Sequence, residues 1–278
     1  MAHELFRLME TVYNTPHLLT EQALQPIVEY IQNRNSFALI ADTKPVEKVK
    51  AEKLSTIGQI NIDGVVTYKP VMGMCGPQGT SYQGILEQAE ELIAEGCDTI
   101  LTVHNSPGGQ ASHCFSTANA IRELCDENNV TWIAYIDTIS ASASLALGVP
   151  ADEVIIHPSA ETGSVGCILA LMDTSKALAN AGLKPVYIAS TPGKTPFDDT
   201  GAFSKEFITE MQSNVTRLGN QFAEHVSTHT GIDVKDVLAM NAKMFHAEAA
   251  LEHGLVTAIM DHKQFGKYMA DKQGAKNA

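Results

Sequence analysis

The chain has 278 residues, of which 44% are hydrophobic and 18% charged, a composition that suits one large globular domain. Its formal net charge of −13 at pH 7 repels phosphate and anionic lipid, which argues against nucleic acid or a membrane surface as partner. The five cysteines form no CxxC pair, so we expect reduced thiols, without a zinc site or a disulfide framework. Neither a signal-peptide pattern nor an apolar run of about 20 residues is present, so we expect a cytoplasmic protein.

Residues 1–53 are expected to form a separate helical arm and linker. Apolar residues recur there at helical intervals, at Leu18, Leu19, Ile27, Val28 and Ile31. A polar stretch with a proline, residues 44–53, follows them and is typical of a linker. We expect the main domain to span 54–262 and residues 263–278 to form a polar, frayed tail.

Between residues 55 and 189 the sequence alternates predicted strands and helices. The strands are predicted at 55–63, 65–68, 99–104, 131–136, 153–157 and 185–189, and the helices at 82–95, 110–125, 141–148 and 174–181. Such repeated βαβ units predict an α/β fold with a parallel sheet and right-handed crossovers.

The last part of the chain is expected to be mainly helical. Helices are predicted at 203–230 and 234–240, before a closing segment at 246–259. The long helix carries a stripe of seven apolar residues: Phe207, Ile208, Met211, Val215, Leu218, Phe222 and Val226. This stripe exceeds what a peripheral helix of a monomer needs and predicts a homo-oligomer, although it would also serve to cap the sheet of its own subunit.

A glycine turn, Asn105-Ser-Pro-Gly-Gly109, follows one apolar strand and precedes a helix. Glycines at the open end of a parallel sheet can aim backbone N–H groups at a developing negative charge. The pattern therefore predicts an oxyanion hole in which Gly109 donates and Gly108 supplies the turn. A turn that merely ends a strand is the alternative.

Three serines, Ser140, Ser142 and Ser144, lie at the start of a predicted helix of small residues. A serine at a helix N-terminus lies in the positive end of the helix dipole, although a cap or packing role is equally compatible with the composition. Lys194 follows downstream in Thr191-Pro-Gly-Lys194-Thr-Pro. A serine hydroxyl needs a positioned base to become a good nucleophile, and the lysine is a candidate for that role.

Four further segments carry a resemblance to a known family. They are Ala141-Ser142-Ala-Ser-Leu-Ala-Leu147, Ala151-Asp-Glu-Val154, Thr162-Gly-Ser-Val-Gly166 and Gly182-Leu-Lys-Pro-Val186. In this order and spacing they resemble the successive motifs of the signal peptide peptidase A family, serine peptidase family S49, over about residues 55–260. The resemblance implies a ClpP/crotonase-type fold and selects Ser142 as the nucleophile.

The resemblance also assigns roles to other residues. It implies that Lys194 is the base and that Ser164 orients this lysine. We expect the amide of Ala143 to join Gly109 in the oxyanion hole, and we expect neither a metal nor a cofactor. In single-domain relatives the serine and the lysine of one site come from neighbouring subunits, so a ring-like homo-oligomer with shared active sites is expected.

The N-terminal segment Asn14-Thr-Pro-His-Leu-Leu19-Thr-Glu resembles the arm of phage capsid assembly proteases of the lambda protein C type. Such proteases degrade scaffold or clip head proteins during head maturation. The expected partners are then scaffold or capsid proteins, and the expected location is the host cytoplasm and the procapsid.

Four alternatives remain open at this stage. His157, with an aspartate such as Asp137, would form a ClpP-like Ser-His-Asp site. A cytosolic peptidase that degrades peptides would use the same residues on other substrates. A crotonase-type enzyme would need the glycine N–H groups alone, and a non-catalytic assembly protein of the same fold would need neither Ser142 nor Lys194.

Overall fold

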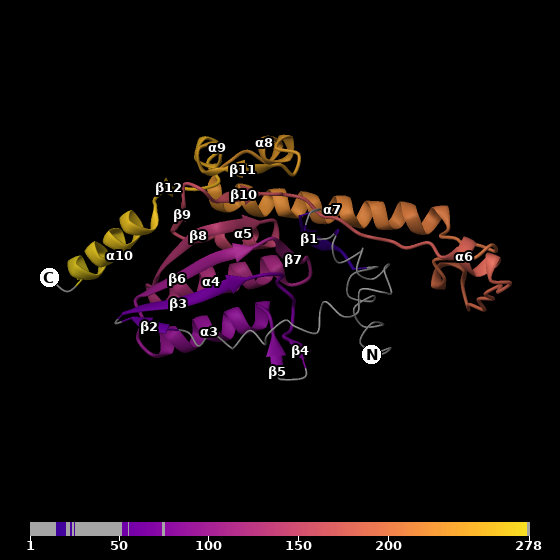
Figure 1. The fold of residues 1–278 in the computed structure, drawn as a ribbon, viewed down its shortest axis with the longest axis horizontal. Helices are drawn as coiled ribbons and strands as arrows, with labels where there is room; N and C mark the ends of the chain where they lie inside the picture. Colours follow the sequence, from indigo (N-terminus) through magenta and orange to yellow (C-terminus); the bar gives the residue numbers. More distant parts are fainter. Residues whose placement is uncertain are drawn as a thin grey trace.

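The computed structural model describes residues 15–20, 23, 25, 52–54, 56–73 and 76–276 of the chain. At its centre is an eight-stranded sheet (Figure 1). Its strands are β2 (Glu52–Leu54), β3 (Ile57–Asp63), β6 (Thr99–Ser106), β8 (Thr131–Ala141), β9 (Glu153–Ile156), β10 (Glu161–Gly163), β11 (Met244–His246) and β12 (Ala258–Ile259). Two small sheets pair β1 (His17–Leu19) with β7 (Gly108–Gln110), and β4 (Val71–Gly73) with β5 (Gly76–Gln78).

Helices connect most of these strands. They are α3 (Tyr82–Ala94), α4 (Cys114–Asn128), α5 (Ala143–Gly148), α6 (Ser175–Asn180), the 3-10 turn η2 (Pro192–Lys194), α7 (Lys205–Thr230), α8 (Val234–Ala239), α9 (Ala247–Glu252) and α10 (His262–Lys276). The central pairs β3–β6, β6–β8 and β8–β9 are all parallel, which confirms the predicted α/β architecture. Among the described residues, no helix is both long and apolar enough to cross a bilayer.

Strand β8 changes partner along its length, and this positions the residue that follows it. Residues 133–136 of β8 pair with β9, whereas residues 139–141 pair with β10. The last register pair joins Ala141 to Gly163. Ser142 therefore leaves the sheet next to the turn that contains Ser164.

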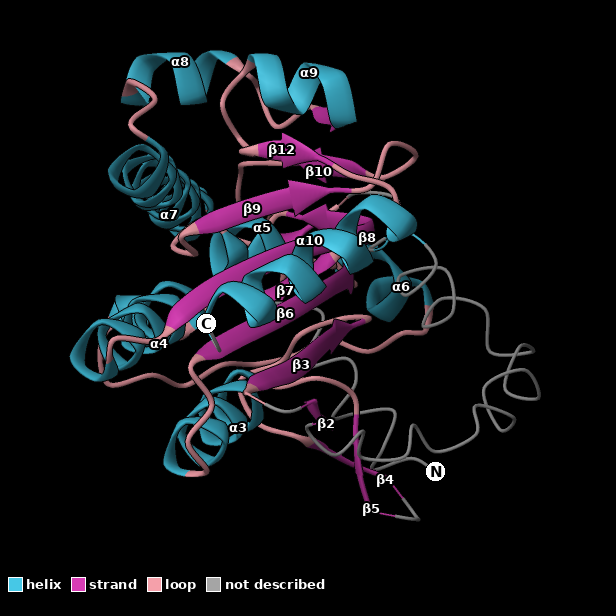
Figure 2. Ribbon diagram, turned by 90° about the vertical axis from the view of Figure 1, so that its left-hand side faces the viewer, coloured by secondary structure: helices cyan, strands magenta, loops and turns pink. Residues whose placement is uncertain are grey.

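The two faces of the sheet bury different side chains, because successive residues of a strand point to opposite sides. Ile100 and Trp132 belong to the main hydrophobic cluster, which also includes residues of α3, α4 and α5. Leu101 and Ile133 face the other way and pack with Met269 of α10. Figure 2 shows α10 crossing this second face.

Helix α10 corrects the expectation of a frayed tail beyond residue 262. Phe265, Tyr268 and Met269 recur at helical spacing and pack onto the sheet. The Lys272 ammonium and the Tyr268 hydroxyl both hydrogen-bond the Glu153 carboxylate of β9. Packing of these three large side chains stabilises the helix. The polar average composition of the segment does not reveal it in the sequence.

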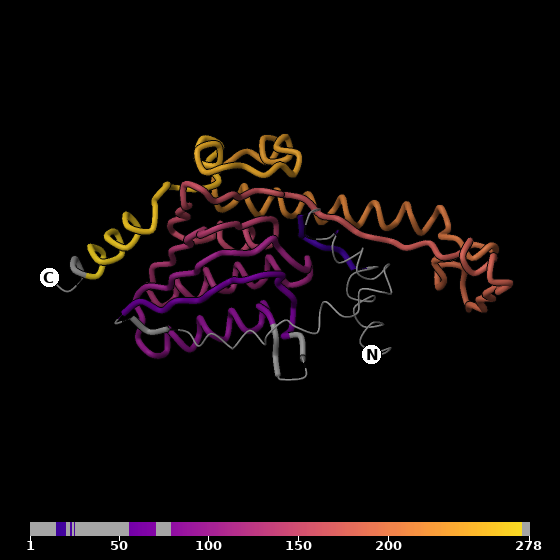
Figure 3. The backbone as a smooth tube through the Cα atoms, viewed as in Figure 1, coloured from indigo at the N-terminus to yellow at the C-terminus, as the bar shows by residue number. Residues whose placement is uncertain are grey.

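The chain from residue 164 to the middle of α7 projects beyond the sheet (Figures 1 and 3). Within α7, Phe222 and Val226 are fully buried in the main hydrophobic cluster of their own subunit. Ile208, near the projecting end, is 44% exposed. The predicted stripe therefore has two parts: its C-terminal half caps the sheet, and its N-terminal half extends past it.

Three predicted elements differ from the structure. The strand expected at 185–189 is absent, and the strand expected at 65–68 is reduced to two isolated bridges, at Val66 and Thr67. The helix expected at 110–125 begins only at Cys114, because residues 108–110 pair with β1 as a strand.

Most of the predicted N-terminal arm, residues 1–53, lies outside the described residues. Where the chain is described, His17–Leu19 is a strand rather than part of a helix, while Ala23 and Gln25 are helical. An apolar pair such as Leu18 and Leu19 fits either element, and pairing with β7 decides between them.

Candidate active site

Ser142 lies at the junction of β8 and α5, where it is the N-terminal cap residue of the helix. Its backbone angles are φ 53° and ψ −115°, outside the regions that a side chain with a Cβ normally adopts. The turn is held on both sides, because the Ser142 N–H donates to Gly163 O at 2.8 Å and the Ser142 carbonyl accepts from Ala146 N at 2.9 Å. A strained residue between a strand and a helix is also the geometry of the nucleophile elbow in other hydrolases.

The Ser142 hydroxyl is fully buried and has no hydrogen-bond partner within the part of the chain that the structure describes. A buried hydroxyl without a partner costs on the order of 1–3 kcal/mol, so proteins rarely keep one without a reason. A base or a substrate that reached this oxygen would remove that cost.

The glycine turn lies directly beside this junction. A Cβ added at Gly108, where φ is +108°, would lie 3.1 Å from the carbonyl oxygen of Ala141, the residue before Ser142. At Gly109 an added Cβ would lie 1.9 Å from the Val66 carbonyl oxygen. Both positions thus require glycine because backbone atoms approach too closely for any side chain.

Two backbone N–H groups, those of Gly109 and Ala143, are the candidate oxyanion donors. Gly109 lies in β7 and Ala143 is the first residue of α5, whose first-turn N–H groups have no acceptor within the helix. The Gly108 N–H instead donates to Ser106 Oγ at 3.2 Å, so Gly108 shapes the turn. This arrangement can stabilise negative charge beside Ser142 without a metal. Among the described residues, no group of three His, Cys, Asp or Glu side chains is placed to hold a metal ion.

A buried histidine, His104 of β6, is the centre of a polar network beneath the site. Its Nδ1 lies 2.9 Å from Ser144 Oγ and 3.3 Å from Ser140 Oγ, and its Nε2 lies 3.0 Å from Thr102 Oγ1. Thr102 Oγ1 also accepts a hydrogen bond from Trp132 Nε1 at 3.1 Å. Burial lowers the pKa of His104 to about 3, so the ring is neutral.

This network holds the residues on both sides of the nucleophile. Ser140 and Ser144 bond each other at 3.0 Å and share the His104 ring, while Ser142 between them points elsewhere. Sequence reasoning assigned His104 no role beyond that of an ordinary polar residue. The available signal was its position inside an apolar strand, one residue before the glycine turn.

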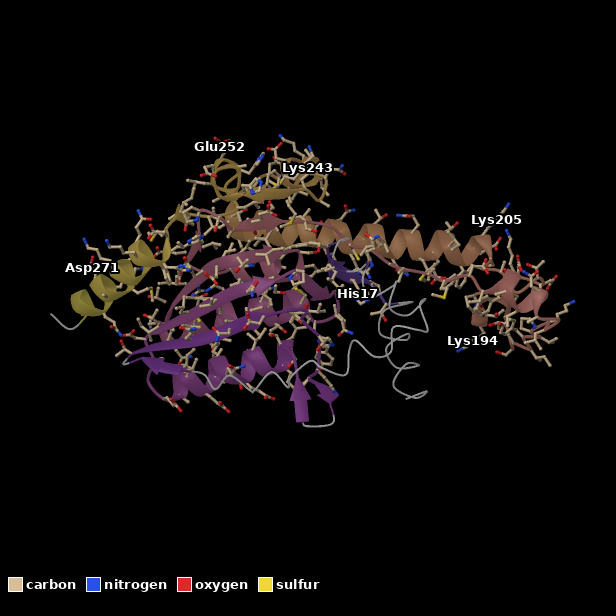
Figure 4. The ribbon with its side chains drawn as sticks, viewed as in Figure 1. His17, Lys194, Lys205, Lys243, Glu252 and Asp271 are labelled. Carbon is tan, nitrogen blue, oxygen red and sulfur yellow. The ribbon has the colours of Figure 1, made fainter. Side chains whose placement is uncertain are left out.

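Lys194 is not brought to Ser142 within one subunit. It ends η2, its side chain is exposed, and Figure 4 places it at the outer end of the projecting segment. Helix α5, which follows Ser142, lies over the sheet instead (Figure 1). Ser142 and Lys194 therefore lie in different parts of the fold.

Ser164 lies in the turn next to Ser142. It has a φ of 58° and follows Gly163, whose carbonyl accepts the Ser142 N–H. The Ser164 N–H donates to Lys243 O at 2.9 Å, which fixes the turn against the chain that leads into β11. Ser164 is a buried residue, with 8% of its surface exposed.

His157 lies away from Ser142 and is engaged elsewhere. Ile156 is in register with Ile136, so His157 is level with Asp137. Asp137 precedes Ser142 by five residues, which separates the two by about 16 Å along an extended strand. The His157 Nδ1 pairs with Ser159 Oγ at 2.8 Å, and Asp137 pairs with His262 at 2.6 Å. The structure thus does not assemble the alternative Ser-His-Asp site.

Cys114 is another potential nucleophile near α5, with its Sγ 3.5 Å from Ala143 O. Burial raises the pKa of its thiol to about 12, so the reactive thiolate does not form near neutral pH.

Comparison with known proteins decides the family. The model of peptidase family S49 matches residues 126–276, which contain Ser142, Ser164 and Lys194. The chain belongs to peptidase family S49. This matches the resemblance found in the sequence motifs.

Among curated relatives, two come from phages. The head-tail preconnector protein GP5 of Enterobacteria phage P21 is 27% identical over 194 residues, which are 69% of this chain and 37% of that protein. The capsid assembly protease C of Escherichia phage lambda is 26% identical over 211 residues, 76% of this chain and 46% of that protein. The chain thus spans less than half the length of either relative.

Two more matches lie outside the phages. A putative protease of the archaeon Methanocaldococcus jannaschii is 24% identical over 164 residues, 58% of this chain and 51% of that protein. Among solved structures, a point mutant of ClpP1 from Listeria monocytogenes aligns with a TM-score of 0.47 at 12% identity, covering 73% of this chain and 91% of that one.

Proposed function

We propose that the chain is a serine endopeptidase in which Ser142 is the nucleophile and Lys194 of a neighbouring subunit is the base. The observation that carries this proposal is the strained Ser142 with its buried hydroxyl, which lacks a partner among the described residues. Ala143 follows Ser142 directly, and Gly109 follows Gly108, whose backbone approaches Ala141.

The chemistry follows from these groups. The neutral amine of Lys194 takes the proton of the Ser142 hydroxyl as Oγ attacks the carbonyl carbon of the scissile peptide bond. The N–H groups of Gly109 and Ala143 hold the oxyanion, and the protonated lysine returns a proton to the leaving amine. Water then hydrolyses the acyl-enzyme. Ser164 orients the lysine in this scheme, because it lies in the turn next to Ser142.

An exposed apolar segment supports assembly of the site between subunits. Leu183 is 59% exposed, Val186 77%, Tyr187 47% and Ile188 97%. This segment overlaps 185–189, which the sequence predicts as a strand and which has no strand partner in the described part of one subunit. An unpaired apolar strand is a template for pairing with another chain. Pairing with a neighbour would carry the nearby Lys194 toward that neighbour's Ser142.

The phage relatives indicate the biological role. The lambda relative is named a capsid assembly protease and the P21 relative a head-tail preconnector protein. We therefore assign this chain to phage head maturation, with scaffold or capsid proteins as substrates. Its formal charge of −13 suits a protein that works without binding nucleic acid.

A fluorophosphonate reagent that traps activated serines tests the proposal. We expect the label on the peptide that contains Ser142, and no label in Ser142→Ala. Ser159→Ala, which changes an exposed serine outside the site, should label like the wild type. Labelling at another residue, or equal labelling of Ser142→Ala, would exclude Ser142 as the nucleophile.

A further inference from the structure

Strand β1 lies between β7 and the chain at Ile168, beside the glycine turn, and we call the position that it occupies the groove. Its residues pair antiparallel with β7, in the register His17 to Gln110, Leu18 to Gly109 and Leu19 to Gly108. On its other side, the His17 N–H donates to Ile168 O at 2.8 Å and the Ile168 N–H donates back to His17 O at 2.9 Å. A three-residue segment from the start of the chain is thus held between two backbone edges.

The ladder directs one carbonyl of β1 at the predicted oxyanion donor. Ala111 N–H donates to Pro16 O at 3.2 Å, and Thr20 N–H donates to Pro107 O at 3.2 Å. Hydrogen-bonded pairs alternate along an antiparallel ladder, so the pair between these two is Leu18 with Gly109. The Gly109 N–H therefore faces the Leu18 carbonyl.

The same carbonyl lies close to the residue that precedes the nucleophile. A Cβ built at Gly108 would lie 2.1 Å from Leu18 O and 3.1 Å from Ala141 O, so both carbonyls adjoin one point in space. Ser142 follows Ala141 directly and is fully buried. The main chain of Leu18 thus occupies the space next to the nucleophile and the donor.

The side chain of Leu18 is buried as completely as any core residue. It has no exposed surface and belongs to the main hydrophobic cluster with Val66 and Tyr82. Val165, which follows Ser164, packs against the same cluster. Apolar side chains of the main hydrophobic cluster thus enclose this leucine beside the glycine turn.

We propose that β1 is an internal ligand of the peptide groove, an extended segment with a buried leucine that must leave before a substrate enters. Proteins commonly bind extended peptides by adding a strand to an exposed edge, with backbone bonds for affinity and a pocket for specificity. The groove accordingly takes an extended polypeptide with a leucine-like side chain at the position of Leu18. This inference rests on the proposed function, because it takes Gly109 and Ser142 as the reacting site.

The small size of the β1–β7 sheet makes such a departure feasible. The two strands form a sheet of their own, separate from the eight-stranded sheet. Apart from its few backbone bonds to β7 and Ile168, β1 depends on the burial of Leu18 to stay in place. Shortening this side chain should release the strand.

The test compares Leu18→Ala with Leu92→Ala, in the full chain. Leu92 of α3 is 2% exposed, so it offers the same truncation at matched burial outside the groove. We measure the rate of fluorophosphonate labelling at Ser142. Leu18→Ala should label about tenfold faster or more than the wild type, because truncating a buried leucine removes most of its packing energy. Leu92→Ala should not label faster.

A synthetic peptide with the sequence of residues 14–20 completes the experiment. Added in trans, it should slow the labelling of Leu18→Ala back toward the wild-type rate. If Leu18→Ala does not fold, as judged by circular dichroism, the milder Leu18→Val takes its place. Labelling of the Leu18 variant at or below the wild-type rate, or a peptide without effect, would show that β1 is a permanent strand and overturn the proposal.

Hydrogen exchange separates this proposal from the proposed function. If no protein labels at Ser142, the nucleophile assignment fails, and the amides of residues 108–110 still report whether the groove is open. Faster exchange there in Leu18→Ala than in Leu92→Ala, reversed by the peptide, supports an internal ligand. Equal exchange in the two variants contradicts it.

Discussion

Acid should destabilise this protein steeply, because two of its histidines are buried without charge. Burial lowers the pKa of His104 to about 3 and that of His225 to about 4. Each therefore binds its proton more readily in the unfolded chain, where a histidine titrates near 6.5. The stabilising contribution is fully present above about pH 6.5 and is lost as the pH falls toward the folded-state pKa.

The size of the effect follows from the same values. Between pH 7 and pH 5.5 the unfolded histidine becomes mostly protonated while the folded one stays neutral, which costs about 1.3 kcal/mol per group. His104 and His225 together should lower the free energy of unfolding by about 2.5 kcal/mol over this interval. A typical domain has on the order of 5–15 kcal/mol in total, so the loss is easily measured.

Urea unfolding at the two pH values, followed by tryptophan fluorescence, measures this loss. The chain has one tryptophan, Trp132, and its indole N–H donates into the His104 network at Thr102. His104→Asn removes one titrating group, so we expect the pH-dependent loss to fall by about half. His113→Asn is the matched control, since His113 is exposed and its φ of 67° suits asparagine. A His104→Asn variant that keeps the full wild-type loss would refute the reasoning.

Three further predictions concern the site and the assembly. Gly109→Ala places a Cβ 1.9 Å from the Val66 carbonyl oxygen, so fluorophosphonate labelling should fall by about two orders of magnitude or more. Normal labelling of a folded variant would show that this position does not require glycine. Lys194→Ala should abolish casein hydrolysis, whereas His157→Ala should keep most of it. The opposite ranking would favour a histidine base. Ile188→Asp changes a residue that is 97% exposed, so the subunit should fold normally. It should sediment as a monomer and lack activity. An unchanged oligomer would exclude this segment from the interface.

The sequence predicted those elements whose stability is local. Strands such as β3 and β6 and the long helix α7 were predicted nearly in place, because alternation and helical spacing reflect burial within one subunit. The segment 185–189 has strand-like residues but no strand partner among the described residues of one subunit. A strand forms only with a partner, and local sequence cannot say whether a partner exists. Helix α10 was missed because its many lysine, aspartate and glutamine residues make the segment polar on average, although three of its apolar side chains pack onto the sheet.

The site was predictable where motif order determines it and not where tertiary contacts do. The order of the motifs selected Ser142 from three nearby serines, and the structure places it beside the glycine turn. The network around His104 joins residues from two strands and a helix, so no local pattern reveals it. The strand at Leu18 was not predicted for the same reason, since its partner β7 is far away in the sequence.

A site shared between subunits is the central claim, and complementation of two inactive variants tests it most directly. Ser142→Ala keeps the lysine and Lys194→Ala keeps the serine, so each protein alone should be inactive. When the two are refolded together, a mixed oligomer contains sites with both residues, and casein hydrolysis should reappear. If mixed oligomers form, as shown by differently tagged subunits that co-purify, and no activity returns, the serine and the lysine do not act together across the interface.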